Sequence, residues 1–188
     1  MLKNAVLALF ASPFLMSADT APVYADIAAV SMIRCGDSQG TAWRSGTGAY
    51  TSAAHVVGAS TECLVDGVLM PVTYSDPDYD IATLRTEKHG EPLEIDCGGF
   101  IDRAGYAGVG FARSAPVQRV IFGLASESLT RIAGWKHFTT LWGDQFIPGM
   151  SGGPVFNSAG KVVGIVSGYN TGAPLSYSQS LSETPLCA

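Results

Sequence analysis

Short apolar segments separated by turn-forming residues follow one another along most of this 188-residue chain. In the first half they cover residues 28–35, 48–52, 62–65, 69–74 and 81–86. In the second half they cover residues 103–109, 114–122, 126–132, 138–141, 153–156 and 161–166. Segments of this length, bounded by Gly, Pro, Asn and Asp, are typical of β-strands. The pattern therefore predicts an all-β protein in which a turn-rich segment, residues 87–94, joins two halves.

Two local features can be predicted in more detail. Residues 157–160, with the sequence Asn-Ser-Ala-Gly, are expected to form a hairpin connection because Asn and Gly tolerate positive φ. A single helical turn is expected at residues 55–58. Counting strands does not by itself distinguish two small barrels from a sandwich.

Composition narrows the range of functions. With 47% hydrophobic and 14% charged residues, the chain has the composition of an ordinary core-forming protein. The 22 glycines and 10 prolines, scattered among the apolar segments, agree with many turns. A net charge of −5 and the lack of a Lys/Arg cluster argue against a nucleic-acid partner. Nothing in the sequence suggests a metal ion or an organic cofactor, so we expect none.

The N-terminal residues are predicted to direct export. Lys3 is followed by an apolar run, residues 5–16, that is short for a membrane span and is interrupted by Pro13. Small residues suitable for signal cleavage end at Ala18 and at Ala25, and we favour cleavage after Ala25. Residues 1–25 are therefore interpreted as a signal peptide, and the protein as periplasmic or extracellular. The alternative is an uncleaved segment that anchors the chain in a membrane.

The stretch Pro-Gly-Met-Ser-Gly-Gly-Pro-Val, residues 148–155, is the most informative for chemistry. It presents Ser151 on a glycine-dense turn just before a predicted strand. A serine hydroxyl becomes a nucleophile when a base takes its proton and nearby donors hold the oxyanion that forms. Glycines allow the tight backbone angles that point N–H groups into one hole. Ser151 is therefore the candidate nucleophile, with the N–H groups of Gly149 and Ser151 as the candidate oxyanion hole.

His55 is the best candidate for the base. It follows Thr-Ser-Ala-Ala at the end of a predicted strand, where small residues allow close packing. The other histidines, His89 and His137, lack this approach. Taken alone, a histidine after apolar residues is more often a core residue, and a Ser-Gly-Gly turn is more often a hairpin.

Asp80 is the best candidate for the acid that orients the imidazole. Asp76 and Asp78 flank Pro77 and are expected to belong to a turn. Asp80 instead opens the apolar segment 81–84, where a carboxylate would be rigid and shielded from water. The alternative is that Asp80 only caps the start of a strand.

The order of these residues in the chain distinguishes the possible scaffolds. The pattern Gly-x-Ser-x-Gly around Ser151 also fits the nucleophile elbow of α/β-hydrolases, but that fold needs a histidine after the serine, and none follows. The subtilisin order needs the acid before the histidine, in a stretch here too short for that fold. The order His55, Asp80, Ser151 is that of chymotrypsin-like enzymes.

The chain resembles trypsin-like (chymotrypsin-fold) serine peptidases in a compact bacterial or phage-like form. The matching segments are residues 52–57, 80–84, 149–155 and 163–168, and the resemblance extends from about residue 30 to the end. It implies two antiparallel Greek-key β-barrels, residues 26–92 and 93–188, with the active site in the cleft between them. It also implies a serine endopeptidase that forms an acyl-enzyme intermediate on Ser151.

The resemblance further implies how a substrate would bind. Ser167, Gly168 and Tyr169 would pair with an extended peptide or protein substrate, and Gln145 would lie at the floor of the specificity pocket. Because Gln145 is not a carboxylate, we expect small or medium uncharged side chains at the cleaved position and no preference for Arg or Lys. Met150 stands where digestive family members carry an aspartate that pairs with a new N-terminus. Activation of that type is therefore not expected.

Four cysteines, Cys35, Cys63, Cys97 and Cys187, lack metal-ligand spacing and agree with an oxidising compartment. Of the three possible pairings we favour Cys35–Cys63, which would brace the hairpin before His55, and Cys97–Cys187, which would tie the C-terminus to the second half. Four reduced thiols are the alternative. We expect a monomer that meets a membrane only through an uncleaved export signal. Two other functions remain possible, a catalytically inactive peptide-binding module and an esterase or amidase for small substrates.

Overall fold

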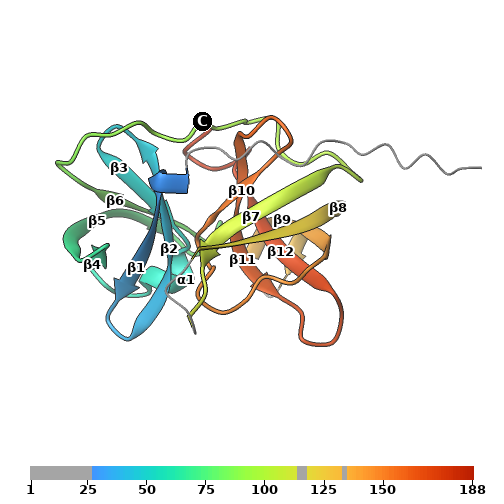
Figure 1. Cartoon of the computed structure of the whole chain (residues 1–188), viewed down its shortest axis with the longest axis horizontal. Coiled ribbons are helices and arrows are strands. Elements are labelled where there is room, and N and C mark those ends of the chain that lie inside the picture. Colours follow the sequence, from blue (N-terminus) through green and yellow to red (C-terminus); the bar gives the residue numbers. More distant parts are fainter. Residues whose placement is uncertain (1–26, 114–117, 133–134) are drawn as a thin grey trace, which may run out of the picture.

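The computed structural model describes the backbone of residues 27–113, 118–132 and 135–188. Two closed antiparallel barrels lie side by side (Figure 1). The first has the strand order β1-β2-β3-β6-β5-β4, and the second has the order β10-β11-β12-β9-β8-β7. The all-β, two-barrel prediction is therefore confirmed. The predicted signal peptide lies outside the described residues, and the predicted domain boundaries stay predictions.

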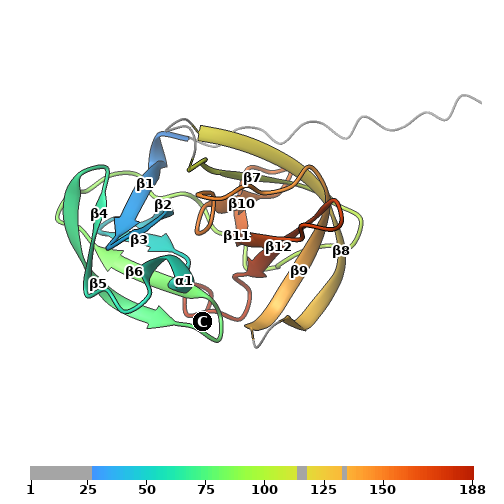
Figure 2. The ribbon, with the colours of Figure 1, turned by 90° about the horizontal axis from the view of Figure 1, so that it is seen from below.

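The first barrel comprises β1 (Val30–Cys35), β2 (Ser38–Gly46), β3 (Ala49–Ser52), β4 (Glu62–Val65), β5 (Val68–Asp76) and β6 (Ile81–Arg85). The second comprises β7 (Gly105–Phe111), β8 (Gln118–Ile132), β9 (Trp135–Gly143), β10 (Pro154–Phe156), β11 (Val162–Tyr169) and β12 (Leu175–Ser180). A 3-10 turn, η1 (Ile27–Ala29), precedes β1, and one turn of helix, α1 (Ala54–Val57), follows β3. Figure 2 shows α1 on the side of the first barrel that faces the second.

Two strands were not predicted because their buried positions are mostly small or polar. In β2, Gly40 and Thr41 are buried beside Ala42 and Trp43. In β12, Ser176 and Gln179 are buried. A hydrophobicity pattern does not detect such strands. The predicted strands at residues 114–122 and 126–132 fall on one strand, β8, with irregular register near Ala125, and residues 114–117 lie outside the described part.

The predicted hairpin at residues 157–160 and the predicted segment between the barrels both lie where the sequence placed them, but that segment is longer than predicted. The hairpin between β10 and β11 closes through bonds from Asn157 N–H to the Lys161 carbonyl, 2.9 Å, and from Gly160 N–H to the Asn157 carbonyl, 3.0 Å. The segment between the barrels runs from β6 to β7 and is longer than the predicted residues 87–94. It is held to the second barrel by a parallel bridge between Ile95 and Val162.

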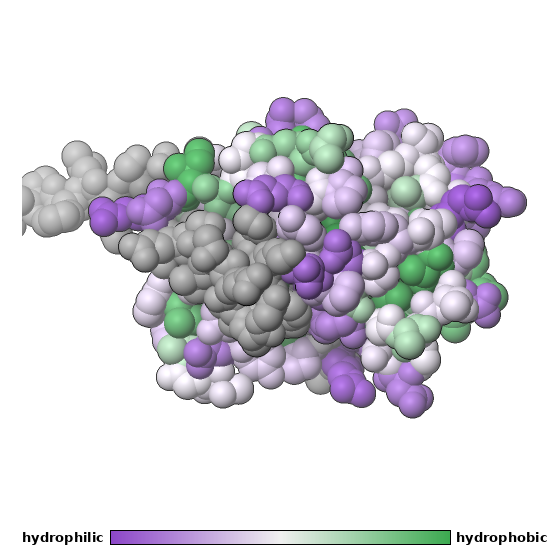
Figure 3. All heavy atoms as spheres, turned by 180° about the vertical axis from the view of Figure 1, so that it is seen from behind, coloured by the Kyte–Doolittle hydropathy of each residue, from purple (hydrophilic) through white to green (hydrophobic). Residues whose placement is uncertain are grey.

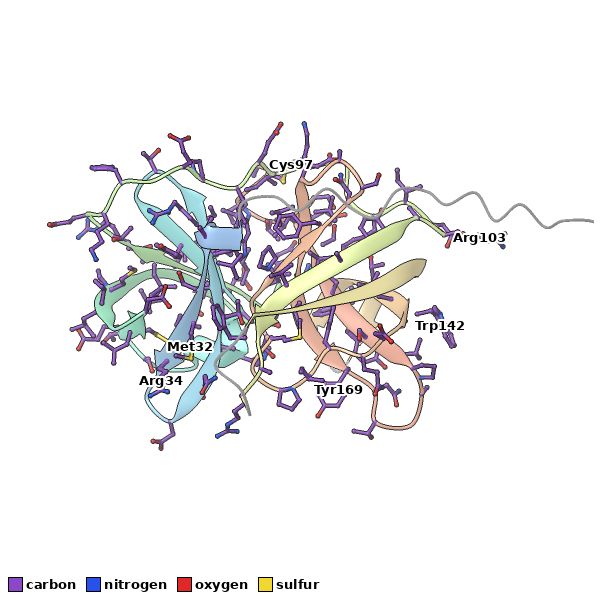
Figure 4. All side chains as sticks on the ribbon, in the orientation of Figure 1. Met32, Arg34, Cys97, Arg103, Trp142 and Tyr169 are labelled. Carbon is purple, nitrogen blue, oxygen red and sulfur yellow. A yellow bond between two sulfur atoms is a disulfide. The ribbon has the colours of Figure 1, made fainter. Side chains whose placement is uncertain are left out.

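Two disulfides form, in the pairing favoured from the sequence. Cys35–Cys63 joins β1 to β4, the two strands whose pairing closes the first barrel. Cys97–Cys187 joins the segment between the barrels to the C-terminal residues, and Figure 4 shows Cys97 at the opposite end of the molecule from Tyr169. The second bond therefore lies on the side of the molecule away from α1.

The larger hydrophobic core is shared between the barrels. It contains the interior of the first barrel, including Trp43, together with Val109, Ile165 and Leu181 of the second half. The barrels are thus packed on each other through buried apolar side chains, which fixes the cleft between them. The face shown in Figure 3 mixes polar side chains with smaller apolar areas. Within the described residues, no helix has the length and apolar character needed to cross a membrane.

Candidate active site

A cleft between the barrels is lined by residues from both. The first barrel contributes residues 37–39 and His55, and the second contributes Ser151 and residues 167–169. The predicted base and the predicted nucleophile therefore line the same cleft, although His55 and Ser151 are 96 positions apart in the sequence. Arg113 also lines the cleft.

The imidazole of His55 is held by Asp80. Its Nδ1 lies 2.9 Å from Oδ1 and 2.9 Å from Oδ2 of the Asp80 carboxylate. The backbone N–H of His55 also donates to Oδ1, at 3.0 Å. The side chain of Asp80 is 1% exposed and that of His55 is 34% exposed. Nδ1 is thus directed at the buried carboxylate, and Nε2 lies on the opposite edge of the ring.

Local sequence explains why Asp80 is placed so firmly. Asp76 accepts hydrogen bonds from the N–H groups of Asp78, 2.8 Å, and Tyr79, 3.3 Å, which makes the turn predicted around Pro77. Asp80 then takes a left-handed φ of 48°, a region in which Asp and Asn are enriched. Its carbonyl accepts the N–H of Ala54 at 3.1 Å. The turn thus directs the carboxylate beneath α1.

The turn that carries Ser151 needs glycine on both sides. Gly149 has φ 98° and Gly152 has φ 86°, angles that side chains with a Cβ rarely adopt. A Cβ on Gly149 would lie 2.4 Å from the Arg113 nitrogen, and one on Gly152 would lie 2.3 Å from Ser52 Oγ. The glycine pattern is therefore required both by the backbone angles and by the close approach of neighbouring atoms.

The N–H groups of this turn fall into two sets. Those of Met150, Gly152 and Gly153 donate to carbonyls of Ile147, Val166 and Met150, at 3.1, 2.7 and 2.9 Å. Those of Gly149 and Ser151 donate to no group in the part of the chain that the structure describes. Two backbone donors near a nucleophile, left without an internal acceptor, are what an oxyanion hole requires.

The edge of β11 is open where a substrate was expected to pair. Strand β10 pairs with β11 only as far as Pro154 opposite Ile165. Beyond that point Gly168 and Tyr169 pair with β12 on one side, and both line the cleft. Tyr169 is 39% exposed. A strand edge without a partner is the kind of edge to which an extended peptide can add by main-chain hydrogen bonds.

The hydroxyl of Ser167 has no hydrogen-bond partner within the described residues, although it is buried at the wall of the cleft. Gln145 lies beside the loop that follows β11. Its Nε2 donates to the carbonyls of Asn170 and Ala173, the latter at 2.5 Å, and its place at the floor of a specificity pocket stays a prediction. It stabilises the loop after β11, and the cleft wall near that position is formed by Phe146.

Met150 is fully buried among apolar side chains of the second barrel, including Phe146, Leu141 and Val166. Packing therefore holds this position of the turn. No group of three or more His, Cys, Asp or Glu side chains in the described residues is arranged to hold a metal ion.

Sequence reasoning missed three residues near the site. Asp37 and Arg113 line the cleft, and Thr41 contacts the Ser151 turn through both its backbone and its side chain. None of them stands in a recognisable motif. The one signal in the sequence is Gly40, which precedes Thr41. Glycine is needed there because a Cβ would lie 2.8 Å from the Ser151 carbonyl oxygen.

Comparison with known proteins agrees with the fold. Residues 39–165, more than half of the chain, match the family described as the trypsin-like peptidase domain. The chain therefore belongs to the trypsin-like peptidase family. No curated protein matches the sequence.

Solved structures of proteases share the fold at low sequence identity. The HtrA-type protease AlgW with a tripeptide has a TM-score of 0.70 at 20% identity, over 81% of this chain and 56% of that one. The active form of the Rv3671c protease from M. tuberculosis has a TM-score of 0.69 at 20% identity, over 95% and 91%. The serine endoprotease from Yersinia pestis has a TM-score of 0.69 at 18% identity, over 82% and 59%. This chain thus spans little more than half the length of AlgW.

Proposed function

We propose that this protein is a serine endopeptidase in which Ser151 is the nucleophile, His55 the general base and Asp80 the acid that orients His55. The observation that carries the proposal is the bonding of His55 Nδ1 to a buried carboxylate, 2.9 Å from each oxygen, at a cleft that Ser151 also lines. Membership of the trypsin-like peptidase family supports the same reaction.

The proposed reaction has two steps. Ser151 Oγ attacks the carbonyl carbon of the scissile bond while His55 Nε2 takes the hydroxyl proton, and the N–H groups of Gly149 and Ser151 bind the oxyanion. His55 then donates that proton to the leaving amine, and the acyl group stays on Ser151. Water then attacks the ester carbon while His55 takes one of its protons; as the bond from that carbon to Ser151 Oγ breaks, His55 returns the proton to Oγ and the acid product leaves. Asp80 stabilises the imidazolium in both steps without itself taking the proton.

The substrate we propose is an extended polypeptide with a small or medium uncharged residue at the cleaved position. The open edge at residues 167–169 supports an extended substrate. Among the described residues Asp37 is the one carboxylate that lines the cleft, and it lies at the turn between β1 and β2 rather than beside Phe146 and Tyr169. An Arg or Lys side chain of a substrate would therefore meet no carboxylate on the wall formed by Phe146 and Tyr169.

We further propose that the protein acts outside the cytoplasm, in the periplasm or the medium. Its two disulfides are of a kind that persists in oxidising compartments.

A fluorophosphonate probe followed by peptide mapping tests the reaction, with Ser151→Ala as the control. We expect one modified residue, Ser151, and cleavage of a peptide library that stops in the Ser151→Ala variant. A folded wild-type protein that is neither labelled nor cleaves would instead support a peptide-binding module. Labelling with hydrolysis of small esters alone would support an esterase or amidase. Peptides with Ala, Val, Leu, Phe or Arg at the cleaved position test the preference, and a strong preference for Arg contradicts it.

A further inference from the structure

Thr41 makes three hydrogen bonds to the second barrel, two of them to the Ser151 turn, while its own carbonyl accepts the Ser52 hydroxyl at 2.8 Å. This residue of β2 has no exposed surface. Its Oγ1 donates to the Gly149 carbonyl at 2.9 Å and accepts the Phe111 N–H at 2.9 Å. Its backbone N–H donates to the Ser151 carbonyl at 2.8 Å. We propose that Thr41 is the positioning residue that sets the orientation of the oxyanion hole, an inference that rests on the proposed serine-peptidase function.

The orientation of the two hole donors follows from the carbonyls that share their peptide units. In a trans peptide the C=O and N–H groups point in opposite directions, and the described residues contain no cis bond. The N–H of Gly149 belongs to the peptide whose carbonyl, on Pro148, accepts the Arg113 N–H at 2.7 Å. The N–H of Ser151 belongs to the peptide whose carbonyl, on Met150, accepts the Gly153 N–H at 2.9 Å. The N–H groups of Gly149 and Ser151 therefore point away from the Arg113 and Gly153 N–H groups that bind the two carbonyls.

The peptide between the two donors, Gly149–Met150, depends on Thr41. Its N–H bonds only within the turn, to Ile147 at 3.1 Å. Its carbonyl is tied to the rest of the molecule by the Thr41 hydroxyl. Because Gly149 has no Cβ, its backbone has several allowed orientations, and the one observed has to be fixed from outside. The hydroxyl of Thr41 supplies that restraint.

Thr41 also connects the halves of the site. It belongs to the first barrel, as do His55 and Asp80, whereas its partners Phe111, Gly149 and Ser151 belong to the second. The hydroxyl both donates and accepts, so it bridges the end of β7 and the turn. Valine matches threonine in shape but makes neither bond, whereas serine makes both.

Kinetics of Thr41→Val and Thr41→Ser test the proposal. We expect Thr41→Val to lower kcat by about 10²-fold, the loss typical of one weakened oxyanion donor, with KM changed by no more than about threefold. We expect Thr41→Ser to restore kcat to within about threefold of the wild type. The matched control is Thr51→Val, because Thr51 is an equally buried threonine of the first barrel whose hydroxyl donates to Ser45 Oγ at 2.7 Å, away from the turn.

Two results would overturn the inference. One is a folded Thr41→Val protein with the kcat of Thr51→Val. The other is a Thr41→Ser protein as impaired as Thr41→Val, which would assign the effect to packing of the methyl group. Should Thr41→Val not fold, Thr41→Ala decides the same question, because it also removes the hydroxyl. A wild-type protein that the fluorophosphonate does not label would refute the proposed function instead, so the two failures are distinguishable.

Discussion

Replacing Asp80 by asparagine should abolish most of the activity without unfolding the protein. Asparagine has nearly the shape of aspartate and tolerates the left-handed φ of 48° found here. Its carbonyl oxygen can still accept the backbone N–H of His55, which now bonds Oδ1 at 3.0 Å. That contact leaves the amide nitrogen at the position of Oδ2, which lies 2.9 Å from Nδ1 of the ring.

The size of the effect follows from this geometry. An amide N–H that faces Nδ1 favours the tautomer with hydrogen on Nε2, the nitrogen that has to accept the serine proton. A neutral amide also gives little stabilisation to the imidazolium. The same substitution in the serine-protease mechanism lowers kcat by about 10⁴-fold. That factor corresponds to roughly 5 kcal/mol in the activation free energy, and we expect a loss of this order for Asp80→Asn.

The assay compares kcat and KM on one cleaved peptide, with thermal unfolding measured in parallel. Asp66→Asn is the matched control, because Asp66 also has a left-handed φ, 47°, and its carboxylate accepts a backbone N–H, that of Met32, at 3.0 Å. The control should keep the wild-type kcat. A folded Asp80→Asn protein that retains more than about one tenth of the wild-type kcat would refute the role assigned to Asp80.

Two further predictions concern stability. Gly152→Ala should lower the free energy of unfolding by more than about 3 kcal/mol, because the new Cβ would lie 2.3 Å from a side-chain oxygen and the residue has a φ of 86°. Gly36→Ala, at a φ of 56° but in open space, should lower it by only about 1 kcal/mol. Urea titration of both variants measures the difference, and equal losses would contradict the crowding argument. Removing the Cys97–Cys187 disulfide by a double Cys→Ser substitution should lower the free energy of unfolding by about 2–5 kcal/mol, since the bond closes a loop of sequence separation 90. An unchanged urea midpoint would show that the bond contributes no stability.

The strands that the sequence predicted correctly are those with apolar buried positions. Residues 62–65 and 81–86 match β4 and β6 closely, because Val65, Ile81 and Leu84 are the residues that enter the core. Strands β2 and β12 were missed because tertiary contacts, and not side-chain hydrophobicity, bury Thr41 and Gln179. Periodicity reports which side chains avoid water, and it does not report a buried hydroxyl such as that of Thr41, whose partners lie elsewhere in the fold.

The residues proposed for the chemistry could be named from the sequence because their local requirements are strong. A glycine-dense turn, small residues before a histidine and an aspartate at the start of an apolar strand are each visible within about ten residues, and their order selected one scaffold. Gln145 could not be placed in this way. Its position relative to Ser151 predicts the floor of a specificity pocket, and only the structure shows that its amide bonds to the carbonyls of Asn170 and Ala173.

The sequence alone therefore determined the kind of protein, the strands with apolar cores, and the residues proposed as nucleophile, base and acid. Only the tertiary structure decided how the turn around Ser151 is held, which residues form the wall of the cleft, and that Thr41 reaches the turn from the other barrel. The reason is physical: a motif records the conformational needs of neighbouring residues, whereas a hydrogen bond between Thr41 and Gly149, 108 positions apart, exists only after two barrels have packed together.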